Sequence, residues 1–282
     1  MKNLRKNLSL AVLVLLFSFN ISQAQDAEDS GLPGENFSLE GALELFKKAD
    51  SPEAFEKMLN EENSNVNNLD LNDDGDVDYV RVIDNMDNEV HAIVLQVPVS
   101  DDESQDIAVI EIEKTGKDEA MLQIIGDEDI YGEQTIVEPF EGQASESGKN
   151  GPHITVERLV VNVWGWPSIR FVYAPGYRAW VSPWRWRVYP AIWHPWRPRT
   201  FAVWHPLVVV HRPHYQVVTT HRVVRAHAVY APRRVGSKTV HTRTTVVKTR
   251  RGTVKKSTTT VRGRNGHVQK RSTTVQGKRR KG

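Results

Sequence analysis

The sequence predicts an α+β protein in which a helical pair packs on an antiparallel β-meander, followed by a Trp/Arg/Pro-rich region and a basic tail of β-hairpin repeats. Three observations support this prediction. Apolar residues recur at helical spacing between residues 38 and 59, and they occupy alternate positions after residue 77. Near the C-terminus, valines recur 14 positions apart at Val247, Val261 and Val275.

Charge divides the chain between Glu157 and Arg158. Residues 26–157 contain 35 acids and 7 bases, whereas residues 158–282 contain 27 bases and no acid. Charge blocks of this kind bear on partners and association more than on fold. From charge and composition we divide the chain into a signal peptide (1–24), a disordered lead (25–36), an acidic α+β domain (37–140), a linker (141–157), a Trp/Arg/Pro-rich region (158–232) and a basic Thr/Val repeat tail (233–282).

The N-terminus has the pattern of a secretory signal peptide. Lys2, Arg5 and Lys6 precede an apolar run from residue 8 to residue 21, and Ser22-Gln23-Ala24 resembles a cleavage site. The run is too short to favour the alternative of an uncleaved anchor helix, and no later apolar run approaches membrane-spanning length. We therefore expect a periplasmic or extracellular protein with no transmembrane helix in the mature chain.

Two short helices are expected to open the acidic domain. Ser38 is a suitable N-cap for a helix that ends near Ala49. Ser51-Pro52-Glu53 supplies a cap, a proline at the first helical position and an acid in the first turn of a second helix, which runs to about Leu59. Their apolar positions would face a common core.

The segment 70–78 has the spacing of a calcium loop. An EF-hand-type loop takes its oxygen ligands from positions 1, 3, 5, 7 and 9, with glycine at position 6. In this chain these ligands would be Asp70, Asn72, Asp74, the backbone carbonyl of Asp76, and Asp78, with Gly75 at position 6. Position 12, where an EF-hand has glutamate, is Arg81. The loop therefore resembles the Asp-x-Asn-x-Asp-Gly-x-x-Asp loops of FG-GAP and dockerin-type repeats, which implies calcium as a cofactor. The alternative is an ordinary Asp/Asn/Gly turn before a strand.

After this loop the pattern predicts an antiparallel meander. Residues 77–84 and 90–99 form one expected hairpin, residues 107–113 and 121–125 a second, and residues 131–140 a fifth strand. Residues 92–95 are apolar on both faces, so this strand should be central. His91 is interpreted as a structural residue. The sequence has no nucleophile elbow, P-loop, zinc-protease motif or cysteine, so we expect no enzyme.

The basic half contains all eight tryptophans, interleaved with Arg and Pro. Arginine stacks on indole faces and binds anions with two hydrogen bonds, so this composition favours a surface for an anionic polymer. Pro175-Gly176 suggests a type II turn within a short hairpin over residues 171–180. Residues 174–206 resemble the YXWGXW-type aromatic repeats of bacterial envelope proteins. The candidate stacking and polyanion-binding residues are Trp164, Trp166, Arg178, Trp180, Trp184, Arg185, Trp186, Arg187, Trp193, Trp196, Arg197 and Trp204.

Three functional hypotheses follow. In the first, the protein is a non-enzymatic envelope or secreted binding protein whose basic aromatic half attaches to an anionic glycan, lipopolysaccharide or extracellular DNA. In the second, it is a structural or assembly protein whose acidic and basic halves pair within or between chains. In the third, the protein is an enzyme, and the motifs present leave only a carboxylate-based or calcium-assisted hydrolase. Some tryptophans could instead form the core of a small β-module.

Overall fold

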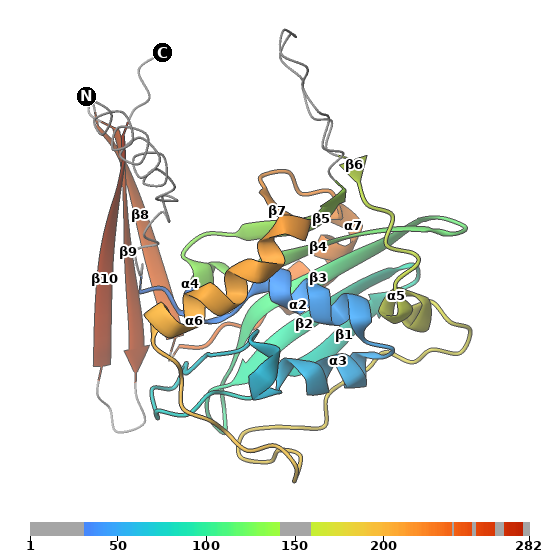
Figure 1. Cartoon of the computed structure of the whole chain (residues 1–282), viewed down its shortest axis with the longest axis horizontal. Coiled ribbons are helices and arrows are strands. Elements are labelled where there is room, and N and C mark those ends of the chain that lie inside the picture. The colour runs from blue at the N-terminus through green and yellow to red at the C-terminus, as the bar shows by residue number, and fades with distance from the viewer. Residues whose placement is uncertain (1–30, 142–158, 239, 250–251, 263–267, 279–282) are drawn as a thin grey trace, which may run out of the picture.

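The computed structural model describes residues 31–141 and 159–238, and the backbone of 240–249, 252–262 and 268–278. The predicted signal peptide, the first residues of the lead and nearly all of the linker lie outside the described residues. Figure 1 shows helices lying across an antiparallel sheet, with a second sheet of three strands at one side. The predicted α+β class is confirmed.

The two predicted helices are α2 (Leu39–Lys48) and α3 (Pro52–Leu59). Each begins at its serine cap: Ser38 Oγ accepts a hydrogen bond from the Gly41 backbone N–H at 2.9 Å, and Ser51 Oγ accepts one from Ala54 at 3.1 Å. Before them, residues of the predicted disordered lead form the short helix η1 (Pro33–Asn36). It is held in place because the Trp204 indole N–H donates to the Glu35 carbonyl at 2.8 Å.

The large sheet is an antiparallel meander. Its strands are β1 (Arg81–Asp87), β2 (Val90–Pro98), β3 (Ser104–Gly116), β4 (Glu119–Gly126), β5 (Thr135–Glu141) and β6 (Leu159–Val160). They pair in chain order, and β7 (Tyr215–Val218) also pairs with β5. The short helix α4 (Glu128–Tyr131) connects β4 to β5. As predicted, β2 is an interior strand, between β1 and β3, and it is buried along its whole length.

The two faces of this sheet have different chemistry. Alternate residues such as Ile110 and Ile112 pack with α2 and α3 in the main hydrophobic core. The residues that alternate with them, Glu111 and Glu113, point to the other face, which is covered by residues 219–237 with helix α7 (Val224–Tyr230). We call residues 219–237 the strap. The acidic half therefore places buried carboxylates beneath a segment of the basic half.

The basic half contains more helix than the sequence suggests. The predicted hairpin over residues 171–180 is wrong: Pro167 opens helix α5 (Pro167–Val172), because proline is well suited to the first helical position. The turn itself is placed correctly, since Gly176 has a φ of 82°. Helix α6 (Phe201–Val208) and the short helices η3 (Val209–His214) and η4 (Ala231–Arg233) complete this part of the chain.

The tail forms three antiparallel strands, as its repeat predicts. They are β8 (Val240–Thr249), β9 (Gly252–Arg262) and β10 (Val268–Lys278), with β9 in the middle. Val247 stands opposite Val254, and Val261 stands opposite both Val240 and Gln269. None of the helices in the described part of the chain is long and apolar enough to cross a lipid bilayer.

Candidate binding site

The aromatic segment of residues 177–199 is fastened to α3 and β1 through one buried carboxylate. Glu56, which is 2% exposed, accepts hydrogen bonds from the Tyr79 hydroxyl at 2.9 Å, the Val82 N–H at 2.8 Å and the Ser182 hydroxyl at 3.0 Å. The Trp180 indole N–H also donates to it at 3.4 Å. Burial raises the pKa of Glu56, although these four donors oppose the shift.

The segment is also fastened through its backbone. Asp84 N–H donates to the Trp180 carbonyl at 2.7 Å, and Ser182 N–H donates to the Val82 carbonyl at 3.0 Å, so this stretch lies beside β1. Further along, the Val77 N–H donates to the Trp196 carbonyl at 2.7 Å. These bonds fix the position of the aromatic side chains because they anchor the backbone on both sides of them.

A cavity of about 1060 Å³ lies between this segment and α3. Trp193 forms part of its wall and is held edge-on against Tyr79 and Tyr189, with ring centroids 5.1 and 4.7 Å away. Ile192, which is 75% exposed, adds an apolar surface at the cavity. The aromatic wall consists of Tyr79, Trp180, Trp184, Trp193 and Trp196. Four of the predicted stacking residues therefore meet in one cavity.

The charges around this cavity are unequally distributed. Glu53 and Glu61 on the α3 side are exposed, and Glu62 forms an ion pair with Arg199 at 3.3 Å. On the aromatic segment, four arginines are exposed and have no carboxylate partner among the described residues: Arg178, Arg185, Arg187 and Arg197. The site thus combines a wall with carboxylates and a segment with uncompensated positive charge.

Two of these arginines lie at a tight turn. Arg185 and Val188 exchange backbone hydrogen bonds of 3.1 and 2.8 Å, which leaves Trp186 and Arg187 at the tip. Arg187 has a φ of 56°, a left-handed conformation that is unfavourable for a residue with a side chain. Its guanidinium carbon lies 5.8 Å from the Trp186 ring centroid, within cation–π range. The strained turn therefore displays an Arg–Trp pair to solvent.

The remaining predicted stacking tryptophans lie elsewhere. Trp166 and Trp204 are 8% and 1% exposed, so their faces contact the protein interior and not solvent. Trp164 packs against Tyr173, with ring centroids 5.6 Å apart, and Lys114 lies over its ring. The two buried tryptophans lie at the start of α5 and within α6, and the spacing of Trp in the sequence does not reveal which tryptophans are buried.

The predicted calcium loop lies next to the aromatic segment. Asp70 accepts hydrogen bonds from the backbone N–H groups of Asp74 and Gly75, at 3.1 and 3.0 Å, so the loop is closed on its first carboxylate. Asp78 is buried and receives the Leu71 N–H, and the Asn72 side chain donates to it at 3.1 Å. Burial raises the pKa of Asp70 to about 6 and that of Asp78 well above its usual value. Calcium binding by these residues stays a prediction.

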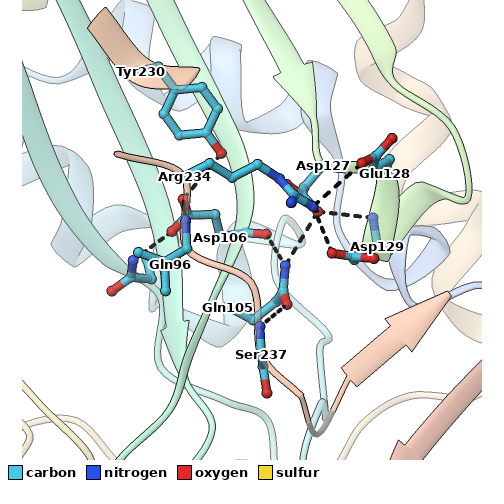
Figure 2. Close-up of polar contacts among 10 residues, drawn as sticks. Gln96, Gln105, Asp106, Asp127, Glu128, Asp129, Tyr230, Arg234 and Ser237 are labelled. Atoms are coloured by element: carbon cyan, nitrogen blue, oxygen red, sulfur yellow. Dashed lines mark hydrogen bonds and ion pairs between the residues drawn. The ribbon is translucent and has the colours of Figure 1, made fainter. Parts of the chain in front are cut away.

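A second polar region was missed by reasoning from the sequence. Beneath the strap, Arg222 pairs with Glu138 at 3.2 Å, Arg225 with Glu113 at 2.9 Å and Arg234 with Asp127 at 2.6 Å; the carboxylates are buried at the sheet. Figure 2 shows the end of this network, where Tyr230 also donates to Asp106 at 3.1 Å. The change from acidic to basic residues at residue 158 indicates that such ion pairs could form. It does not indicate which residues pair.

Comparison with protein-family models, curated proteins and solved structures finds no match to this chain. Its function is therefore argued from the geometry of its own residues.

Proposed function

We propose that this chain is a non-enzymatic, exported binding protein of the cell envelope that holds an anionic glycan. The sugar rings would stack in the cavity beside α3, and the anionic groups would pair with the arginines of the neighbouring segment. The observation that carries this proposal is the meeting of Trp180, Trp184, Trp193 and Trp196 in one cavity, next to arginines without carboxylate partners.

The chemistry of the cavity favours a glycan over a nucleic acid. Aromatic faces stack on sugars and on bases alike, so the tryptophans do not discriminate. The wall opposite them carries Glu53 and Glu61, whose carboxylates can accept hydrogen bonds from sugar hydroxyls but would repel a continuous phosphate backbone. A polymer with anionic groups on one side and hydroxyls on the other matches both walls.

The same cavity supports a binding role more than a catalytic one. Its buried carboxylate, Glu56, is occupied by four hydrogen-bond donors that hold the aromatic segment in place. A general acid or base needs a lone pair or a proton directed at the substrate. Glu56 instead directs its oxygens at Tyr79, Val82 and Ser182, which agrees with a structural role.

Binding of three polymers to the purified chain would test this proposal. We expect heparin, a sulfated glycan, to bind with a Kd that rises steeply with salt, whereas neutral dextran and single-stranded DNA bind more weakly. Trp184→Ala should weaken heparin binding by about tenfold, since loss of one stacking contact is worth about 1–3 kcal/mol. Trp164→Ala, outside the cavity, is the matched control. Equal losses in the two variants, or preferred binding of DNA, would contradict the proposal.

The arginines can be tested separately from the tryptophans. Replacing Arg185 and Arg187 by Ala should lower the dependence of heparin affinity on salt. With two fewer arginines paired to the polymer, fewer counterions are released on binding. Arg212→Ala is a suitable control, since Arg212 also lies on the surface but belongs to a different part of the basic half, near Glu40. An unchanged salt dependence in the double variant would exclude these two arginines from the site.

A second candidate is a structural or assembly protein in which the two halves pair. The observation in its favour is that Arg199, Arg212, Arg222, Arg225 and Arg234 each lie within ion-pair distance of a carboxylate from the acidic half. Light scattering at about 0.05 M and about 0.5 M salt distinguishes assembly between chains from pairing within one chain. Assembly predicts oligomers that dissociate as salt rises, and pairing within one chain predicts a constant molecular mass.

Calcium binding to the loop of residues 70–78 is tested by titration calorimetry. If the loop binds calcium, the heat is lost in Asp74→Ala and retained in Asp101→Ala, where an exposed acid outside the loop is removed. We expect a Kd of about 10⁻⁴ to 10⁻³ M, in the range of extracellular modules. If the intact chain gives no heat, residues 70–78 form an ordinary turn.

A further inference from the structure

Two histidines of the strap meet a carboxylate of β3. His221 Nε2 lies 2.6 Å from Glu111 Oε2, and His227 Nδ1 lies 2.8 Å from Glu111 Oε1. Each of the three residues offers one possible ligand atom, and these three atoms lie within 4.8 Å of one another. The imidazole rings of His221 and His227 also pack against each other, with centroids 4.5 Å apart. Glu111 is separated from the histidines by about a hundred residues of chain, so the fold itself builds this group.

Glu111 differs from the other buried carboxylates under the strap. Three of those carboxylates, Glu113, Glu138 and Asp127, each receive an arginine, and Asp106 is held by Tyr230 and the Val235 N–H. Glu111 is completely buried, and its hydrogen-bond partners among the described residues are the two imidazoles.

The neighbouring arginines do not place a positive charge against the Glu111 carboxylate. Arg222 follows His221 directly but is bonded to Glu138, and Arg225 lies between the two histidines in the sequence but is bonded to Glu113. Glu111 is completely buried and lies near a second carboxylate, that of Glu113, so the site accommodates a bare carboxylate poorly. A bound cation would compensate this charge where no side-chain cation does.

The ligand set and its dimensions match a transition metal and not calcium. Two imidazole nitrogens and one carboxylate oxygen form a ligand set used by catalytic zinc sites, whereas calcium prefers six or more oxygens. With metal–ligand bonds of about 2.1 Å, ligand atoms in a tetrahedral site lie about 3.4 Å apart. Here the candidate ligand atoms of the three residues all lie within 4.8 Å of one another, and each imidazole nitrogen contacts a different oxygen of Glu111, at 2.6 and 2.8 Å. His221 and His227 keep 20% and 31% of their side chains exposed, which leaves access for water as a fourth ligand.

We propose that Glu111, His221 and His227 form a binding site for one divalent transition-metal ion of the zinc class, which fastens the strap to strand β3. This site is independent of the aromatic cavity and of the predicted calcium loop. Because Glu111 and the strap come from opposite halves of the chain, the metal would stabilise the attachment of the basic half to the acidic half.

Cobalt titration of the full chain after treatment with a chelator tests the site. Co²⁺ replaces zinc in such sites and absorbs visible light, so its spectrum reports the ligand geometry. We expect one Co²⁺ per chain and displacement by Zn²⁺, with Zn²⁺ raising the melting temperature. His221→Ala and His227→Ala should each raise the Kd by at least about tenfold. The matched controls are His205→Ala and His214→Ala, which remove histidines of the same half outside the group.

Glu111→Gln separates metal binding from packing, because the amide has the size of the carboxyl group but no charge. Circular dichroism establishes that each variant is folded before its titration is compared. The proposal predicts weaker Co²⁺ binding in folded Glu111→Gln and no rise of its melting temperature with Zn²⁺. It is overturned if the intact chain binds no Co²⁺, or if the folded variants at Glu111, His221 and His227 bind it as tightly as the controls.

Discussion

Arg234 offers the most direct test of how the two halves hold together. Its guanidinium binds Asp127 through two nitrogens, with Nε 2.6 Å from Oδ2 and Nη2 2.8 Å from Oδ1, and Nη2 also lies 2.7 Å from Asp129 (Figure 2). Asp127 is nearly buried, with 3% of its side chain exposed, and it also caps α4 by accepting the Asp129 N–H at 2.9 Å. The change Arg234→Ala therefore leaves a buried carboxylate without its cation.

The size of the effect follows from this geometry. Removing one partner of a fully buried ion pair costs about 3–5 kcal/mol, because the other charge stays desolvated. Arg234 keeps 32% of its side chain exposed, so water screens part of the interaction and we expect a loss of about 2–3 kcal/mol. In a chain of this length, this corresponds to a fall in melting temperature of about 5–10 °C.

Urea unfolding followed by tryptophan fluorescence measures this loss. The control is Arg212→Ala, because Arg212 is 55% exposed and lies 4.0 Å from Glu40, a pair worth less than about 1 kcal/mol. A double-mutant cycle with Asp127→Asn should give a coupling energy above about 1 kcal/mol, since the residues are in direct contact. If Arg234→Ala costs no more than Arg212→Ala, the strap is not held by this pair and the reasoning is refuted.

Three further predictions concern the acidic half. Burial raises the pKa of Asp106 to about 6, so the folded chain binds a proton there more tightly than the unfolded chain. This group should therefore contribute a fall in stability of up to about 3 kcal/mol as pH rises from about 4 to about 6, and urea unfolding should show a smaller fall in Asp106→Asn. Ser38→Ala removes the cap of α2 and should lower the unfolding free energy by about 1 kcal/mol; an unchanged urea midpoint would contradict this role. Gly126→Ala would place a Cβ 2.5 Å from the Tyr131 ring and should lower the unfolding free energy by about 1–3 kcal/mol, whereas Gly165→Ala, with nothing near its Cβ, should not.

Sequence reasoning succeeded where structure is decided locally. The Ser-Pro-Glu start at residue 51 and the cap at Ser38 depend on hydrogen bonds within one turn, so the sequence alone predicts both helices. The alternation at the start of the meander is likewise a local pattern, and the interior position of β2 follows from residues 92–95 being apolar on both faces. These features need no knowledge of the rest of the chain.

The sequence failed where distant segments meet. Residues 171–180 have the aromatic composition of a hairpin, yet the backbone around Pro167 and the packing of Ile169 and Val172 in the main core favour a helix. The aromatic wall at Trp193 likewise depends on Tyr79, more than a hundred residues earlier in the chain. Spacing within one segment carries no information on such contacts, so the four tryptophans of the cavity could be predicted only as members of a larger set.

The arginines that follow the charge switch at residue 158 have two different roles in the fold. Arg222, Arg225 and Arg234 of the strap are bonded to buried carboxylates, so water and salt screen these pairs less than pairs in which both partners are exposed. Arginines of the aromatic segment, such as Arg185 and Arg187, are exposed and have no such partner in the part of the chain that the structure describes. Raising the salt concentration should therefore weaken attachment to an anionic polymer well before it weakens the fold. A near-neutral total charge thus conceals one set of arginines used for stability and another available for binding.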